Sequence, residues 1–382
     1  MNTPLSFVVA AALVLPSLSF ANPAPASFVP PPPDIAGKAY FLNDFNSQQL
    51  IAVRDPDLRV EPASLTKLMT AYLTFKALRE KRLTLEQTLL VSAKGWKTEG
   101  SRMFLDPKTP VTVSDLIRGM IVQSGNDACV TLAEAIAGSE EVFGQLMTRE
   151  ARRLGMNGTH FVNSTGLPGQ QHYTTVRDLS TLANAVIRDF PEFYPIYSMK
   201  EFRYNNITQP NRNLLLYRDP KVDGMKTGYT DAAGYNLIAS ARIDGRRVVS
   251  VVVGTASPEA RATESGKLLN YGLQFFEAPK LYAANKPVSS LTVYKGEASQ
   301  LNIGFGRDIY ATVPKGSTGR IQAKLNTPAY LVAPIKAGQQ IGQLTLTLDG
   351  KVLVQQPVVA LAAVAEAGAL GRLVDSIKMM IK

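Results

Sequence analysis

A change of pattern near Pro279 and Pro287 divides this chain into two parts that must fold differently. Before it, stretches with apolar residues at helical spacing alternate with apolar runs typical of strands. After it, from Val288 to Ala363, short segments of alternating apolar and polar residues are separated by turns. With 382 residues, of which 45% are hydrophobic, the chain can form two packed domains. We therefore predict a mixed helix-and-strand domain followed by a small all-β domain.

The N-terminal part is predicted to contain two hairpins and several amphipathic helices. The hairpins are expected at 39–42 with 50–53, and at 236–243 with 247–254, where Asp244-Gly245 is a typical hairpin turn. One helix is predicted to begin after Pro62, another to begin at Val113, and a third to end at Ala137. Three more are predicted over 140–154, over 174–189 with Thr174 as its cap, and over 259–276. Loops are predicted for 92–103 and 200–220.

The C-terminal part is predicted to consist of short strands joined by turns. They are expected at 291–294, 309–313, 319–325, 329–332, 342–348 and 352–355. Asp349-Gly350, between the last two, is another hairpin turn. Because no polar chemistry is concentrated here, we expect this domain to be a spacer or a docking module.

The N-terminus carries the pattern of an export signal. A largely apolar run from Phe7 to Phe20 precedes Ala21, and it is short for a transmembrane span. We predict a signal peptide over 1–21, with an uncleaved anchor as the alternative, and a Pro-rich lead-in over 22–34. The protein is therefore expected to be exported.

The C-terminus, residues 366–382, is predicted to be an amphipathic helix. It is too short and too charged to span a bilayer. One face is apolar and the other basic, which favours a helix lying in the plane of an anionic membrane. A helix packed against the β domain is the alternative. The two faces comprise Leu370, Leu373, Val374, Ile377 and Ile381 on one side, and Arg372, Asp375, Lys378 and Lys382 on the other.

Composition removes several classes of function. The net charge of +10 suits nucleic acid, anionic lipid or cell-wall polymer, but no zinc-finger spacing, RNA-binding signature or dense basic run accompanies it, so no nucleic-acid partner is expected. The single cysteine, Cys129, forms no intramolecular disulfide and reads as a buried thiol. Two histidines, His160 and His172, leave little for a His-based triad or metal site, and no cofactor or metal is expected.

Three short motifs are weak singly and informative as a set. Ser64-Leu65-Thr66-Lys67 places a hydroxyl and an amine three residues apart, on one face of a predicted helix start. Ser124-Gly125-Asn126 follows about 60 residues later at a helix junction, and Lys226-Thr227-Gly228 enters a strand about 100 residues after that. Alone, each fits a helix start or a turn. Together they form an ordered Ser-x-x-Lys, Ser-x-Asn, Lys-Thr-Gly series.

This series resembles the low-molecular-mass penicillin-binding proteins of the D-alanyl-D-alanine carboxypeptidase group, peptidase family S11, which includes penicillin-binding proteins 5 and 6. The Ser-Gly-Asn form of the second motif favours this group over class A β-lactamases. The resemblance implies an α+β fold in which a β-lactamase/transpeptidase-like domain over 35–280 has an antiparallel sheet with helices on both sides. A β-rich domain over 281–365 and the membrane-anchoring helix over 366–382 would follow.

The resemblance also implies roles for the motif residues. Ser64 would attack the carbonyl between two terminal D-alanines of a peptidoglycan stem peptide, and would also be acylated by β-lactams. Ser124 would relay a proton to the leaving amine and Asn126 would hold the substrate amide. Lys226 and Thr227, with Arg212, would bind the free carboxylate. Gly228 would allow close approach of the strand, and backbone N–H groups near Ser64 and after Gly228 would form the oxyanion hole.

Activation of Ser64 falls to Lys67, since no well-placed histidine is available, and Lys67 must be neutral to accept a proton. Burial and a second cation, for which Lys226 is the candidate, would lower its pKa. Tyr229 stands where some relatives carry histidine. A β-lactamase, a D,D-endopeptidase and a non-catalytic wall-binding scaffold are the alternatives. The expected location is the periplasmic face of the bacterial inner membrane.

Overall fold

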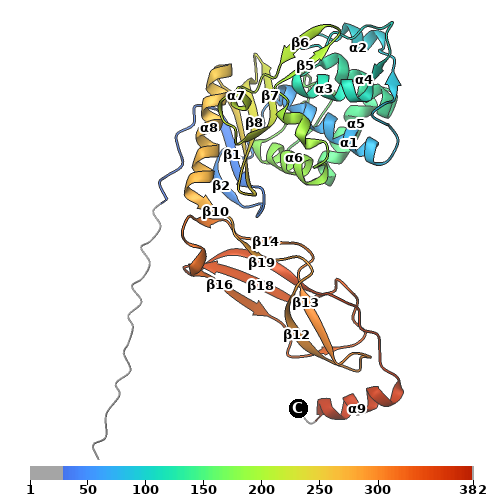
Figure 1. The fold of residues 1–382 in the computed structure, drawn as a ribbon, viewed down its shortest axis with the longest axis vertical. Helices are drawn as coiled ribbons and strands as arrows, with labels where there is room; N and C mark the ends of the chain where they lie inside the picture. Colours follow the sequence, from blue (N-terminus) through green and yellow to red (C-terminus); the bar gives the residue numbers. More distant parts are fainter. Residues whose placement is uncertain (1–28, 381–382) are drawn as a thin grey trace, which may run out of the picture.

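A computed structural model describes residues 29–380 of the chain (Figure 1). The predicted signal peptide, the first part of the lead-in and residues 381–382 lie outside the described residues. Figure 1 shows a larger domain of helices and strands, then a β domain, then a terminal helix at the far end from the larger domain. The two-part organisation predicted from the change of pattern is therefore present, and the fold is α+β.

The larger domain is built on a five-stranded sheet in which every neighbouring pair is antiparallel. Its order is β2 (Leu50–Arg54), β1 (Ala39–Asp44), β9 (Arg246–Thr255), β8 (Gly234–Ile243) and β7 (Val222–Thr230). Both predicted hairpins are confirmed. Asp244 and Gly245 have φ angles of 48° and 80°, the left-handed pair that a two-residue turn of this hand requires.

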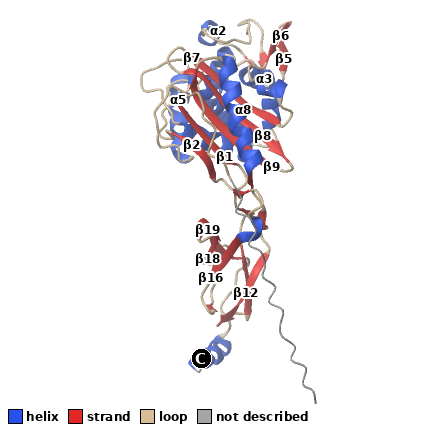
Figure 2. Cartoon of the chain, turned by 90° about the vertical axis from the view of Figure 1, so that its left-hand side faces the viewer, coloured by secondary structure: helices blue, strands red, loops and turns tan. Residues whose placement is uncertain are grey.

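Helices cover both faces of this sheet. Alternate residues of β9 point to opposite sides: Val249 and Val251 join one apolar core, whereas Val248 and Val252 join the other. The second core lies under α8 (Pro258–Phe275), which Figure 2 shows against the strands. The first core is shared with α1 (Lys67–Arg79), α3 (Val113–Val122), α4 (Asn126–Ala137), α5 (Glu140–Arg153) and α6 (Val176–Asp189). The predicted antiparallel sheet between two helical layers is confirmed.

Several local predictions were wrong. Ser64 lies not in the α-helix but in a 3-10 turn, Ala63–Thr66, directly before α1. The predicted loop over 92–103 contains a short helix, α2 (Ala93–Lys97), because the Ser92 hydroxyl accepts the Gly95 N–H and caps it. Thr175 rather than Thr174 caps α6.

The segment 200–220 is also more regular than predicted. It contains a hairpin of β5 (Glu201–Tyr204) and β6 (Ile207–Pro210), followed by the short helix α7 (Leu215–Arg218). Asn205 and Asn206 have φ angles of 47° and 57°. Asparagine adopts this left-handed conformation more readily than most residues, so the Asn205-Asn206 pair favours a hairpin turn. Two further small elements are β3 (Thr88–Leu89) with β4 (Val111–Thr112), and a 3-10 turn over Tyr194–Ser198.

The β domain contains a six-stranded sheet in the order β16-β18-β19-β13-β12-β17. Sequence patterns missed β13, and the predicted strand 309–313 is two short strands that pair with segments following α8. A 3-10 turn, Thr318–Arg320, precedes β16. The bounds are β10 (Phe276–Glu277), β11 (Lys280–Tyr282), β12 (Pro287–Tyr294), β13 (Gln300–Gly304), β14 (Ile309–Tyr310), β15 (Val313–Pro314), β16 (Ile321–Asn326), β17 (Leu331–Val332), β18 (Gln340–Leu348) and β19 (Lys351–Ala360).

The terminal helix is α9 (Ala369–Met380), shorter than predicted at its start. The Asp375 carboxylate accepts the backbone N–H of Lys295 at 2.7 Å, at the end of β12, and the Ala367 N–H donates to the Lys295 carbonyl at 2.8 Å. Its apolar side chains nevertheless face outward, as Leu370 is 78% and Met380 85% exposed. Among the helices of residues 29–380, none is long and apolar enough to cross a membrane.

Candidate active site

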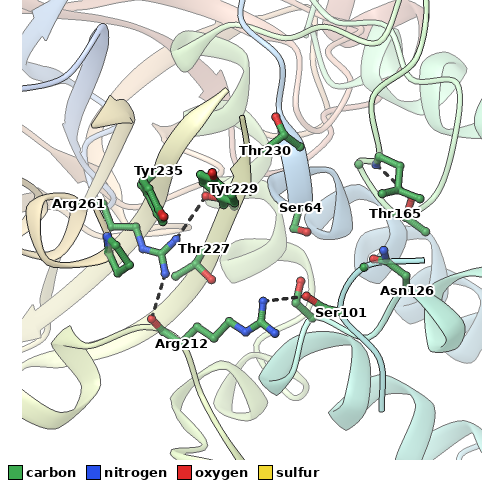
Figure 3. A pocket seen from close by; sticks show the side chains of 16 residues that line it. Ser64, Ser101, Asn126, Thr165, Arg212, Thr227, Tyr229, Thr230, Tyr235 and Arg261 are labelled. Atoms are coloured by element: carbon green, nitrogen blue, oxygen red, sulfur yellow. Dashed lines mark hydrogen bonds between the residues drawn. The ribbon is translucent and has the colours of Figure 1, made fainter. Parts of the chain in front are cut away.

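The three motifs meet in one cleft of the larger domain, although up to 164 positions of sequence separate them. Figure 3 shows Ser64, Asn126, Thr227 and Arg212 around this cleft, whose volume is about 450 Å³. Ser124 and Gly228 line it as well. Lys67 and Lys226 are 1% and 3% exposed and lie within the protein wall. The structure thus brings together the residues of all three motifs and Arg212.

The backbone around Ser64 is tightly constrained. Ala63 has a φ of 48°, an uncommon conformation for a non-glycine residue. A Cβ on Gly166, whose φ is +86°, would lie 1.8 Å from the Ala63 carbonyl oxygen, so only glycine fits there. A Cβ on Gly228 would lie 3.2 Å from the Ser64 nitrogen. Gly228 therefore lets β7 approach the turn that carries Ser64.

Lys67 has three oxygen partners arranged around its amine. Its Nζ lies 3.0 Å from Ser64 Oγ, 2.7 Å from Asn126 Oδ1 and 2.6 Å from the Thr165 carbonyl oxygen. The carbonyl oxygens of Asn126 and Thr165 can only accept hydrogen bonds, whereas the Ser64 hydroxyl can also donate. A neutral amine has two N–H groups, and it can donate one to each of these carbonyl oxygens. Its lone pair then faces the Ser64 proton, the geometry of a general base.

The pKa of Lys67 is lowered to about 8, mainly by burial and also by the charge of Arg212, against the opposing effects of Cys129 and Asp127. The pKa of Lys226 is also well below its usual range, because of burial first and the neighbouring charge of Lys67 second. The sequence argument assigned Lys226 as the cation acting on Lys67. Burial is the main cause, as that argument also expected, and the mutual repulsion of Lys67 and Lys226 acts beside the charge of Arg212.

Ser124 lies in the break between α3 and α4, with a φ of 63°. Its buried Oγ has no hydrogen-bond partner within residues 29–380. Such strain and an unpaired buried hydroxyl are more common at functional sites than elsewhere. This hydroxyl is free to bond a ligand in the cleft.

Both ends of the Asn126 side-chain amide are hydrogen-bonded within the protein. Its Oδ1 accepts from Lys67, and its Nδ2 donates to the Glu99 carbonyl oxygen at 2.6 Å. Gly100, with a φ of +86°, makes room for this amide, since a Cβ there would lie 2.7 Å from Nδ2. The structure therefore gives Asn126 a role in orienting Lys67 that the sequence had not indicated.

The other end of the cleft is cationic. Arg212 Nη1 donates to Ser101 Oγ at 2.7 Å, and Arg261 donates to the carbonyl oxygens of Gly228 at 3.3 Å and of Arg212 at 3.4 Å (Figure 3). Neither guanidinium has a carboxylate partner among residues 29–380. Burial, then the charge of Arg212, lowers the pKa of Arg261 to about 10. This pair, with buried Lys226, makes a site for an anion.

Sequence reasoning missed Arg261. It belongs to no motif, and the signal available was its position seven residues before Leu268, on the inward face of the predicted 259–276 helix. A buried arginine on a core-facing stripe needs an anionic partner, and within the described residues none is supplied by the protein.

The histidine and cysteine side chains have structural contacts. His172 Nδ1 accepts the Val162 N–H at 3.1 Å, and its Nε2 lies 2.9 Å from Thr66 Oγ1, so the ring supports the turn after Ser64. Burial lowers the pKa of His172 to about 4, which keeps it neutral. Burial also raises the pKa of the Cys129 thiol to about 12. Lys67 is thus the only amine or imidazole hydrogen-bonded to Ser64 among the described residues.

This geometry is typical of a serine hydrolase in which a lysine lies beside the serine, and the cationic end of the cleft can bind an anion. Comparison with known proteins agrees. The D-alanyl-D-alanine carboxypeptidase family model matches residues 26–257, and the model of the penicillin-binding protein 5 C-terminal domain matches 276–366. The chain therefore belongs to the D-alanyl-D-alanine carboxypeptidase family, in the penicillin-binding protein 5 and 6 group.

Individual relatives resemble the chain over most of its length. It is 39% identical to the D-alanyl-D-alanine carboxypeptidase DacA of Escherichia coli, over 93% of this chain and 90% of that protein. The crystal structure of penicillin-binding protein 5 from Haemophilus influenzae is 40% identical with a TM-score of 0.84, over 88% of this chain and 99% of that one. Penicillin-binding protein D2 from Listeria monocytogenes, in its ampicillin-bound form, is 28% identical with a TM-score of 0.59, covering 64% of this chain and all of its own.

Proposed function

We propose that this enzyme removes the terminal D-alanine from peptidoglycan stem pentapeptides through an acyl-enzyme on Ser64. The observation that carries the proposal is the buried Lys67 amine, 3.0 Å from Ser64 Oγ, with its pKa lowered to about 8. Lys67 takes the Ser64 proton while Oγ attacks the carbonyl carbon between the two D-alanines. Ser124, whose hydroxyl is unpaired, passes a proton to the leaving amine. Water then hydrolyses the ester.

Substrate binding is assigned to the cationic end and to the backbone. Thr227, Arg212 and Lys226 hold the free carboxylate of the terminal D-alanine, and Arg261 joins them. Backbone N–H groups of Ser64 and Tyr229 hold the developing oxyanion, which the close approach of Gly228 supports. Asn126 orients Lys67 through its Oδ1. Its Nδ2 leaves the Glu99 carbonyl oxygen when substrate binds and then holds the substrate amide.

Intact-protein mass spectrometry during turnover of diacetyl-Lys-D-Ala-D-Ala tests the proposal. We expect free D-alanine together with a protein adduct equal to the acyl half of the peptide. A protein that releases no D-alanine and forms no adduct would be the non-catalytic scaffold. D-Alanine release that exceeds release from a cross-linked peptide separates the carboxypeptidase from the D,D-endopeptidase alternative.

β-Lactams are proposed to acylate the same serine, since a relative of this fold is known in an ampicillin-bound form. Class A β-lactamases hydrolyse the acyl-enzyme with a loop glutamate, and no Glu-x-x-Leu-Asn stretch precedes Lys226-Thr227-Gly228 here. We therefore expect slow nitrocefin turnover relative to D-alanine release. Faster nitrocefin turnover would favour the β-lactamase.

The carboxylate assignment predicts how the enzyme responds to a peptide amide. Converting the C-terminal carboxylate of the substrate to an amide should lower kcat/KM about 30-fold in the unmodified enzyme, because charge-assisted hydrogen bonds to the Arg212 side are lost. Arg212→Gln should lower kcat/KM for the peptide acid by a similar factor, and should lower kcat/KM for the peptide amide little. The measurement is kcat/KM for both peptides with both proteins.

The control for this cycle is Arg203→Gln, an exposed arginine on β5 outside the cleft, which should behave like the unmodified enzyme. Equal losses for acid and amide on Arg212→Gln would show that Arg212 acts on structure rather than on the carboxylate.

The location is proposed from both ends of the chain. We infer export by the signal peptide at 1–21 to the periplasmic side of the inner membrane. There α9 would lie on anionic lipid, because its exposed apolar residues, including Leu373 at 60% and Ile377 at 52%, have no cover within the described residues. The Asp375 contact with Lys295 fixes the helix to the β domain, which would then hold the active site away from the lipid.

Deleting 367–382 should release the protein from membranes while leaving its activity unchanged, because α9 is remote from the cleft (Figure 1). Flotation with vesicles containing anionic lipid measures binding, and D-alanine release measures activity. Leu373→Glu with Ile377→Glu should give the same result without shortening the chain, and Arg372→Lys should bind normally. Continued flotation of the deleted protein would contradict the anchor.

A further inference from the structure

A second hollow adjoins the catalytic cleft on the far side of its arginines. It has a volume of about 510 Å³ and shares Arg212, Arg261 and Pro258 with the cleft. Its remaining lining is largely apolar: Pro210, Asn211, Leu214 and Tyr217. The two spaces are therefore neighbours that meet at the guanidinium pair. None of the roles proposed above uses this hollow.

The walls of this hollow are held by the protein itself. The Tyr217 hydroxyl donates to the carbonyl oxygen of Lys200 and lies 3.3 Å from the carbonyl oxygen of Asn211. The buried Asn211 side chain donates to the Met199 carbonyl oxygen at 3.0 Å, and its N–H donates to the Lys200 carbonyl oxygen at 2.7 Å. Proline adds stiffness at 210 and 258. The hollow is thus formed before a ligand arrives, which lowers the entropy cost of filling it.

The position of the hollow identifies what can reach it. Arg212 and Arg261 have no carboxylate partner among residues 29–380, so a ligand carboxylate belongs at the border between cleft and hollow. The atoms nearest to that carboxylate are the α-carbon of the C-terminal residue and its side chain. The methyl group of D-alanine fills little of 510 Å³. A larger apolar side chain would bury several methylene groups there, and a cationic side chain would meet two arginines.

We propose that this hollow is the subsite for the side chain of the leaving C-terminal residue, and that the enzyme also releases D-residues with large apolar side chains, such as D-leucine and D-methionine. The inference rests on the proposed function, since it places the carboxylate on the arginine side of the cleft. It extends the substrate class from D-alanyl-D-alanine to D-alanyl-D-Xaa ends in which Xaa is apolar.

The test is a series of peptides, diacetyl-Lys-D-Ala-D-Xaa, with alanine, leucine, methionine or lysine as Xaa. Burial of each methylene group is worth up to about fourfold in binding, and exposure of the hollow reduces this gain. We expect kcat/KM for the leucine and methionine peptides to lie within threefold of the alanine peptide or above it. The lysine peptide should be at least tenfold poorer. Leucine and methionine values more than threefold below alanine would overturn the subsite.

The second measurement uses a variant in which a larger side chain fills the hollow. Leu214→Trp should lower the ratio of kcat/KM for leucine over alanine at least tenfold, because the larger ring occupies the space. Leu90→Trp, on an exposed leucine outside both cavities, should leave the ratio and the activity unchanged. Labelling with fluorescent penicillin counts folded active sites in each protein. An unchanged ratio in Leu214→Trp overturns the inference, whereas absence of D-alanine release from the unmodified enzyme overturns the proposed function instead.

Discussion

Ser64→Ala is expected to abolish covalent labelling by fluorescent penicillin and to lower D-alanine release by at least about 10⁴-fold. The reason is chemical: Ser64 is the hydroxyl in the cleft that is hydrogen-bonded to the buried Lys67 amine, at 3.0 Å. Without that oxygen no ester forms, and the remaining groups only bind the peptide. Gel fluorescence reports labelling, and a coupled D-alanine assay reports turnover.

Ser198→Ala is the matched control, because Ser198 is exposed and lies outside the cleft. It should label and turn over like the unmodified enzyme. Persistent labelling of Ser64→Ala would place the nucleophile elsewhere and would remove the basis of the mechanism.

Lys67→Arg should lower the acylation rate by about 10³-fold or more, although it keeps the positive charge. An arginine side chain stays protonated throughout the accessible pH range, so it cannot take the Ser64 proton. Acylation by the unmodified enzyme requires neutral Lys67, whose pKa is lowered to about 8. The rate should therefore rise with pH, about tenfold per unit on the acidic side, and level off above about pH 9. Stopped-flow acylation by a fluorescent penicillin measures both effects.

Lys76→Arg is the control on the same helix, since its ammonium pairs with Glu150 at 3.2 Å, away from the cleft. It should retain the rate and the pH profile. A profile for Lys67→Arg that keeps the same rise near pH 8 would show that another group is the base.

The chain's own patterns anticipated the two-part fold and most of the catalytic set. The two apolar strand patterns and the Asp244-Gly245 dipeptide predicted the β8–β9 hairpin. The dipeptide is informative because few residue types readily adopt the left-handed conformation that such a turn requires. Ser64, Ser124 and Lys226 were visible because each belongs to a short motif. Errors fell on local features, such as the Ser92 cap, which is one side-chain hydrogen bond, and the Asn205-Asn206 turn, which is a pair of left-handed backbone conformations.

What stayed hidden depends on backbone atoms and on contacts between distant segments. The Thr165 carbonyl that fixes Lys67 has no side-chain signature, and Gly166 is explained only by its approach to Ala63. Arg261 belongs to no motif and reaches the cleft from α8. The lowered pKa of Lys67 comes mainly from burial, which the packing of α1 against the α4 layer creates.

By itself, the sequence determined the family and the order of the motifs that single out Ser64 as the proposed nucleophile, because these are properties of residue type and spacing. Only the tertiary structure decided how deeply Lys67 is buried, that Asn126 Oδ1 contacts its amine, and that an apolar hollow lies beyond Arg212. Distance and exclusion of water set these properties, and both arise when segments far apart in the chain are packed together.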